Sequence, residues 1–197
     1  ARLMLAVVGR KIEVTMFIQT EATPNPATLK FLPGREVMGT GAANFTTVES
    51  AKRSPLATSL FTVDGVSGVF LGGDFITVTN SGDKDWETLK PQILGSIMDH
   101  FSSDKPVISE EAESTDNADE DGVVTQIKEL LDTRVRPAVA QDGGDIVFHG
   151  FEDGIVYLEM HGACAGCPSS SATLKHGFEN MLKYYVPEVE EVRPYEG

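Results

Sequence analysis

The chain has 197 residues, which is enough for one ordinary domain or two small ones. Its composition, 41% hydrophobic and 23% charged, is normal for a globular protein, and no apolar run is long enough to span a bilayer. The net charge of −14, from 30 acidic and 16 basic residues, leaves no basic footprint, so neither nucleic acid nor a membrane is an expected partner.

The first fifteen residues resemble a targeting segment only faintly. They carry Arg2, Arg10 and Lys11 but no small-residue cleavage site and no serine. We therefore expect residues 1–15 to be an extension and Met16 to open the folded part. For the same reason we expect the bacterial cytoplasm as the compartment, with the mitochondrial matrix as the alternative.

Residues 16–101 form the first predicted domain, in which short strands and helices are mixed. MFIQT and ATLKFL are typical of strands, and GVSGVFLGGDFITVTN alternates about a Gly-Gly-Asp turn as a hairpin does. SPLATSLF predicts a short helix with Ser54 as its cap and Pro55 in the first turn. DWETLKPQILGSIMDHF has one apolar helical face, and Pro91 should kink this helix or delay its start. The domain has no cysteine, and we expect no chemistry of its own.

The segment 102–122, SSDKPVISEEAESTDNADEDG, carries eight acids and one lysine, so its charge of −7 is half of the net charge of −14. Such a segment has too little apolar surface to offset the entropy of ordering, and its like charges keep it extended. We therefore predict an acidic flexible linker that joins two small α/β-mixed domains, and an α+β fold class.

The second predicted domain, residues 123–197, contains a hairpin between two helices. VVTQIKELLDTRVRPAVAQ has a helical apolar face, and Pro137 should bend or end this helix. DGGD then supplies a turn, and DIVFHGF and GIVYLEM form a hairpin about Asp153 and Gly154. SSSATLKHGFENMLKYY predicts the second helix, and EVEEVRP predicts a last strand that closes the sheet.

The only two cysteines of the chain, Cys164 and Cys167, lie in the stretch GACAGCPSS between a strand and a helix. Pro168 suits the first helical turn, which makes Cys167 a cap residue. Unpaired N–H groups and the helix dipole favour the thiolate form there. A C-x-x-C pair without a secretion signal indicates a reducing compartment, in which the thiols serve chemistry.

Four chemistries compete for this pair. A thioredoxin-like dithiol–disulfide exchanger needs further strands and another helix after the motif, and thirty residues follow Cys167. A zinc site needs four ligands, and His161 would be a third, with His149 and His176 nearby in sequence. An inert buried pair conflicts with the small polar flanks of the loop. An iron–sulfur cluster needs four thiolates, which two chains together would supply.

The stretch from IKELLDTRVRPAVAQDGGD through HGACAGCPSSSATLKHGFENMLKYYVPEVEEV closely resembles the NifU-like C-terminal domain of the Nfu iron–sulfur proteins. MFIQTEATPNPATLKFLPG and the region through Phe101 resemble the Nfu N-terminal domain. The resemblance implies a non-enzymatic scaffold or carrier that holds a [4Fe–4S] cluster, or alternatively a [2Fe–2S] cluster, bridged between two chains.

The resemblance also assigns residues and partners. The family's ligand pair falls on Cys164 and Cys167, and its DGGD motif falls on Asp142–Asp145, which we interpret as turn residues and not ligands. The implied partners are a second copy of the chain when the cluster is bound, an upstream assembly scaffold and client apo-proteins. The dithiol–disulfide oxidoreductase and the zinc-binding module stay as alternatives.

Overall fold

The computed structural model describes residues 16–109, 122–166 and 170–195, with side chains in the last range from residue 175. Within these ranges the strands form two separate sheets, and each sheet has its own hydrophobic core. The predicted α+β fold class is therefore confirmed. No helix in the described part of the chain is both long and apolar enough to cross a membrane.

The first sheet has five antiparallel strands in the order β1-β2-β5-β4-β3. Its strands are β1 (Gln19–Ala22), β2 (Thr28–Leu32), β3 (Ala43–Phe45), β4 (Val66–Leu71) and β5 (Ile76–Asn80). The helices are α1 (Val48–Ala51), α2 (Pro55–Phe61) and α3 (Trp86–Ser102). The predicted hairpin is the pair β4 and β5. The short elements β3 and α1 were not predicted.

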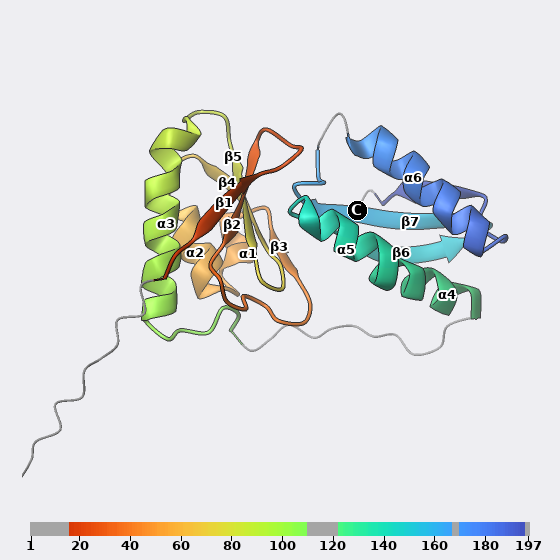
Figure 1. The fold of residues 1–197 in the computed structure, drawn as a ribbon, viewed down its shortest axis with the longest axis horizontal. Coiled ribbons are helices and arrows are strands. Elements are labelled where there is room, and N and C mark those ends of the chain that lie inside the picture. The colour runs from red at the N-terminus through yellow and green to blue at the C-terminus, as the bar shows by residue number, and fades with distance from the viewer. Residues whose placement is uncertain (1–15, 110–121, 167–169, 196–197) are drawn as a thin grey trace, which may run out of the picture.

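The helices of the first domain lie on one face of its sheet, the face turned away from the second domain (Figure 1). The predicted cap of α2 is confirmed, since Ser54 Oγ accepts a hydrogen bond from Ala57 N at 3.0 Å and Pro55 occupies the first turn. The predicted apolar face of α3 is buried in the core at Leu89, Ile93 and Ile97. The helix does not start late, because it begins at Trp86 and runs through Pro91.

The first domain continues beyond its predicted end at residue 101. Helix α3 extends through Ser102, and the chain then folds back on the domain. Ser54 Oγ donates to the Val107 carbonyl at 2.5 Å, and Val107 and Ile108 pack against the core. The predicted linker start at residue 102 is therefore wrong, because these two apolar side chains gain from burial on the first domain. The rest of the predicted linker, 110–121, lies outside the described residues.

The second domain contains a three-stranded sheet in the order β6-β7-β8. Strands β6 and β7 are antiparallel, and β8 runs parallel to β7 at the edge. The elements are α4 (Gly122–Leu130), the π-helical turn η1 (Leu131–Val135), α5 (Arg136–Gln141), β6 (Gly144–Glu152), β7 (Ile155–Gly162), α6 (Ser170–Tyr185) and β8 (Glu191–Pro194). The predicted hairpin and the last strand are both present.

Pro137 does not end the helix in which it lies. The turn η1 precedes it, and the N–H of Arg136 donates to the Leu131 carbonyl, which is an i to i−5 bond. A π turn of this kind lets a helix absorb a residue that lacks an N–H and continue on the other side. The helix consequently runs on to Gln141.

The helices of the second domain all pack on one face of its sheet. Their apolar residues meet Ile146, Val156 and Leu158 of the strands in one buried core. At the hairpin turn, Asp153 and Gly154 have φ values of 49° and 78°, as a type I′ turn requires. The opposite face of this sheet carries the polar side chains of β6 and β7.

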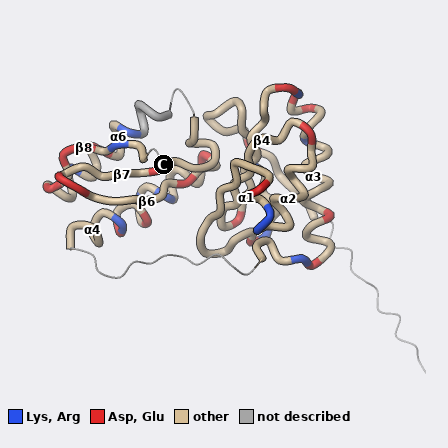
Figure 2. The backbone as a smooth tube through the Cα atoms, turned by 180° about the vertical axis from the view of Figure 1, so that it is seen from behind, with Lys and Arg blue, Asp and Glu red and all other residues tan. Residues whose placement is uncertain are grey.

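The two domains lie side by side, with the helix-free face of the first sheet turned toward the second domain (Figure 1). Figure 2 shows acidic residues at the end of the second domain that is remote from the first, around the turn between β6 and β7 and before β8.

Candidate functional site

Cys164 lies in the turn that follows β7, at the end of the second sheet nearest the first domain. The turn starts at Gly162, whose φ is +62°, and is closed by a hydrogen bond from Ala165 N to the Gly162 carbonyl at 3.2 Å. Ala165 is exposed, whereas the residue Cys164 is only 3% exposed. Cys167, the second predicted site residue, lies outside the described residues.

The turn Asp142–Asp145 provides the space for this thiol. Gly144 is the first residue of β6 and pairs with Gly162. A β-carbon at Gly144 would collide with the Cys164 sulfur, and it would also lie 2.9 Å from the His161 carbonyl. Gly144 is therefore needed for the close approach of β6 to the cysteine turn.

Arg136 fixes the start of β6 beside this glycine. Its guanidinium donates from Nε to Asp145 Oδ1 at 3.1 Å and from Nη1 to Asp132 Oδ1 at 2.9 Å. Asp145 is buried, so the ion pair satisfies a carboxylate that would otherwise be costly to desolvate. The structure thus places the DGGD motif as a turn and strand start, as the sequence predicts.

His161 was predicted as a candidate third ligand of a zinc site, and the structure pairs it with Glu159 instead. His161 Nε2 lies 3.0 Å from Glu159 Oε1, and His149 Nε2 lies 2.7 Å from Glu159 Oε2. Burial alone would raise the pKa of Glu159, but hydrogen bonds from His161 and His149 outweigh it and lower that pKa. Among the residues with described placement, no group of three His, Cys, Asp or Glu side chains is arranged to hold a metal ion.

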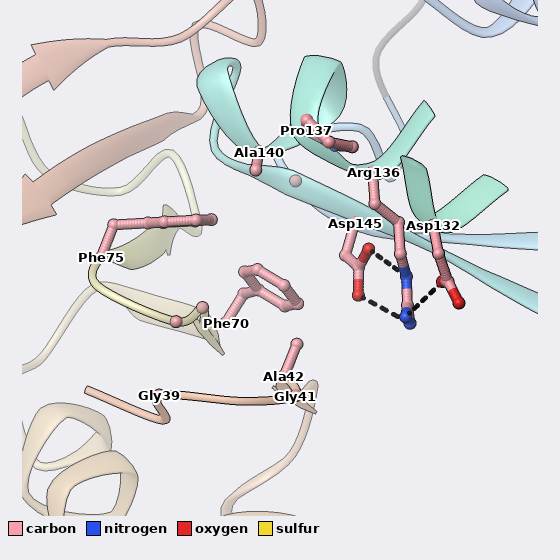
Figure 3. Close-up of a pocket in the computed structure, with 13 residues that line it drawn as sticks. Gly39, Gly41, Ala42, Phe70, Phe75, Asp132, Arg136, Pro137, Ala140 and Asp145 are labelled. Atoms are coloured by element: carbon pink, nitrogen blue, oxygen red, sulfur yellow. Dashed lines mark hydrogen bonds and ion pairs between the residues drawn. The ribbon is translucent and has the colours of Figure 1, made fainter. Parts of the chain in front are cut away.

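A cavity of about 270 Å³ lies between the two domains, next to the cysteine turn. Figure 3 shows Phe70 and Phe75 of the first domain on one side of it and Arg136, held by Asp132 and Asp145, on the other. Gly144 is part of its wall, so the cavity reaches the residue against which the Cys164 thiol packs.

The first domain contributes contacts to the cysteine turn that the sequence did not predict. Asn25 Nδ2 donates to the Ala165 carbonyl at 3.3 Å, and Thr77 Oγ1 donates to the Gly143 carbonyl at 2.6 Å. Asn25 lies in the turn between β1 and β2, and the only sequence signal for Thr77 was the alternation of polar and apolar residues along β5. That alternation is equally typical of a sheet face exposed to water.

Two family models match the chain and together cover both domains. The model described as "Scaffold protein Nfu/NifU N terminal" matches residues 18–104, and the model described as "NifU-like domain" matches residues 127–193. The second match includes the cysteine turn and the DGGD motif. The first match includes the strands whose side chains contact that turn.

Full-length relatives share about half of their aligned residues with this chain. The human protein named "NFU1 iron-sulfur cluster scaffold homolog, mitochondrial" is 54% identical over 180 residues, which are 90% of this chain and 71% of the human protein. "NifU-like protein 4, mitochondrial" of Arabidopsis thaliana is 55% identical over 185 residues, 90% of this chain and 65% of that protein. The Drosophila virilis protein with the same name as the human one is 52% identical over 192 residues, 95% of this chain and 64% of that protein.

Proposed function

Since this chain belongs to the Nfu family of iron–sulfur cluster scaffold proteins, we propose that it binds a cluster through Cys164 and Cys167 and transfers it to client apo-proteins. The cluster is the cargo of the protein and is not a cofactor of catalysis. The protein performs no turnover of its own.

The ligand count requires a second source of thiolates. Clusters of the common kinds need four protein ligands, and this chain contains two cysteines. A second copy of the chain is the simplest source, because a two-fold axis through the cluster makes the two cysteine pairs equivalent. The cargo is then one [4Fe–4S] cluster per two chains, with [2Fe–2S] as the alternative.

The observation that carries the proposal is the position of Cys164 in a chain of a scaffold family. Its sulfur lies at the end of a strand and packs against Gly144, where a residue with a β-carbon would collide with it. The exposed residues Ala165 and Gly166 form the tip of the same turn. A cluster shared by two such turns is exposed when the chains separate, which suits delivery better than permanent electron transfer.

The donor is an upstream assembly scaffold, and the clients are apo-proteins that need the same cluster. The relatives named above are mitochondrial proteins by name, which favours mitochondria over the bacterial cytoplasm that the first fifteen residues had led us to expect. We therefore place the function in the mitochondrial matrix.

The test is to replace each cysteine in turn. Cys164→Ala and Cys167→Ala should each lose the brown colour, the bound iron and sulfide, and the cluster-linked dimer, because two ligands of four then disappear from the bridge. His161→Asn is the matched control, since it removes the H-x-x-C histidine and leaves both thiolates. Iron, sulfide and native mass analysis of anaerobically reconstituted full-length protein provides the measurement.

Two results would contradict the proposal. A complete cluster on a single chain, or in either alanine variant, would exclude the bridged dimer. A colourless protein that reduces test disulfides would favour the dithiol–disulfide oxidoreductase, and zinc bound in place of iron would favour the zinc-binding module.

A further inference from the structure

Polar side chains of the first domain are buried on the face of its sheet that carries no helix. Asn25 and Lys30 are each 7% exposed, and Thr77 is fully buried, yet none of the three belongs to the hydrophobic core of the domain. Phe70 is buried on the same face and also lies outside that core. We call these four residues, Asn25, Lys30, Phe70 and Thr77, the docking face.

The hydrogen bonds that the docking face donates to the second domain end on backbone carbonyls on either side of the cysteine turn. Lys30 Nζ donates to the Gln141 carbonyl at 3.1 Å. The bonds from Thr77 to Gly143 and from Asn25 to Ala165, given above, complete the set. One segment lies just before β6 and the other just after β7, so the docking face holds both sides of the cysteine site.

Glycines on the second domain allow this close contact. A β-carbon at Gly143 would lie 2.9 Å from Thr77 Oγ1, and one at Gly162 would lie 3.0 Å from the Phe70 ring. Both glycines have positive φ, a conformation that other residues rarely adopt. The Phe70 ring also meets the His161 ring edge-on, with centroids 6.4 Å apart. The two surfaces are therefore complementary in shape as well as in hydrogen bonding.

We infer that the docking face binds the cysteine turn of its own chain in the cluster-free protein and must release it before a second chain can share a cluster. In the docked state the carbonyls on both sides of Cys164 are held, so the turn cannot move its thiol, which is buried in the core of the second domain, to the surface. A bridging cluster needs the thiols of two chains to face each other, so docking and bridging compete for the same turn. Only this last step depends on the proposed function.

The size of the contact fits a reversible interaction. The three hydrogen bonds and one aromatic contact named above, all between described residues, are few compared with a permanent interface, which carries about ten hydrogen bonds. The covalent connection between the domains compensates, because a tether keeps the effective concentration of one domain near the other in the millimolar range. We therefore expect the docked state to be the main state of a single cluster-free chain, and the cluster-bridged dimer to replace it when a cluster and a second copy are present.

The experiment measures how fast iodoacetamide alkylates the two cysteines of the cluster-free, full-length protein. Thr77→Val keeps the side-chain shape but removes the donor to Gly143, and it should increase the rate about fivefold, the effect of one hydrogen bond on an opening equilibrium. Phe70→Ala should increase it further. Thr79→Val is the matched control, since Thr79 lies on the same strand and face but makes no hydrogen bond to any described residue of the second domain. It should alkylate at the wild-type rate.

Small-angle scattering of the same variants should show a larger radius of gyration for Thr77→Val and Phe70→Ala, and both should form the cluster-linked dimer at lower chain concentration. Trp86 fluorescence verifies that the first domain is still folded in each variant. Wild-type alkylation rates and wild-type scattering in both Thr77→Val and Phe70→Ala would overturn the inference. Failure of the wild-type protein to form a cluster-linked dimer would instead overturn the proposed function, because alkylation and scattering are measured without any cluster.

Discussion

At position 144 the absence of a side chain determines where the Cys164 thiol can lie. The Cys164 sulfur occupies the space that a β-carbon of residue 144 would need. The ion pair of Arg136 with Asp145 fixes the next residue of β6, so the start of this strand has little freedom to move away from the sulfur. The thiol position is thus set by packing against backbone and not only by its place in a C-x-x-C motif.

We predict that Gly144→Ala displaces Cys164 and lowers the amount of cluster bound per chain severalfold. The methyl group must push either the sulfur or the start of β6, and relief of such overpacking typically costs about 1–3 kcal/mol. Gly150→Ala is the control in the same strand, because nothing lies within 4 Å of the position of its β-carbon. Iron and sulfide content after reconstitution gives the answer. Equal loading of the two variants would show that the thiol does not depend on this contact.

At the scale of helices and strands, the predictable elements are those with local signals. The Ser54–Pro55 start of α2 and the Asp153–Gly154 turn follow from capping and φ preferences that act within a few residues. The three-residue strand β3 has no such local signal. It is stabilised by its pairing with β4, which is distant in sequence. The continuation of α5 past Pro137 depends on the π turn before it, which the apolar pattern does not encode.

The candidate site divides in the same way. The cysteine pair was apparent from the sequence because no other thiol exists in the chain. The role of Gly144 was not, since it depends on β6 and β7 being paired in one register. The docking face was missed because Lys30 and Thr77 alternate with core residues, and such a pattern indicates a solvated face unless another domain covers it.

Helix α3 contains a buried histidine whose charge the fold disfavours. His100 is buried at the last turn, and no described residue offers a hydrogen-bond partner to its Nε2. Burial, with a smaller contribution from the charge of Lys105, lowers the pKa of His100 below its ordinary value of 6.5. As the pH falls below 6.5, the unfolded chain therefore takes up a proton that the folded chain does not, and the folded state loses stability.

We predict that His100→Leu stabilises the first domain by about 1 kcal/mol at pH 8, because an unpaired buried nitrogen disappears. The gain should grow between pH 6.5 and pH 5, where the wild-type protein loses stability and the variant does not. Urea unfolding followed by the fluorescence of Trp86, the only tryptophan of the chain, measures the first domain. Met98→Leu, at an exposed position of the same helix, should change little at either pH. A gain independent of pH would show that protonation of His100 does not destabilise the folded state, and no gain at pH 8 would show that its unpaired nitrogen costs nothing.

At the scale of the whole molecule, the linker connects two domains that also contact each other directly. Residues 110–121 contain seven acidic residues, and their only apolar side chains are those of alanine. We expect a segment of this composition to serve as a solvated tether whose length matters more than its individual charges.

We predict that replacing all seven of these acids with Ser and Gly, at constant length, leaves cluster loading and the docked state unchanged. Iron and sulfide analysis and small-angle scattering of the variant against the wild-type protein provide the test. A variant with two substituted acids serves as an intermediate point. Progressive loss of loading with the number of acids removed would show that the segment binds iron or contacts a domain.

The parallel pairing of β7 and β8 has an electrostatic consequence. The β6–β7 turn precedes β7 and the cysteine turn follows it, so they lie at opposite ends of that strand, and α6 carries the chain back so that β8 starts beside the β6–β7 turn. Glu152, Asp153, Glu188 and Glu190 gather at the second end, where Glu190 N donates to the Gly154 carbonyl at 2.7 Å (Figure 2). The eight residues of β7, at about 3.3 Å each, separate the two ends by roughly 25 Å. This distance is more than twice the Debye length at physiological ionic strength, about 8 Å, so a strongly acidic protein can accept a cargo that four thiolates make anionic without repelling it.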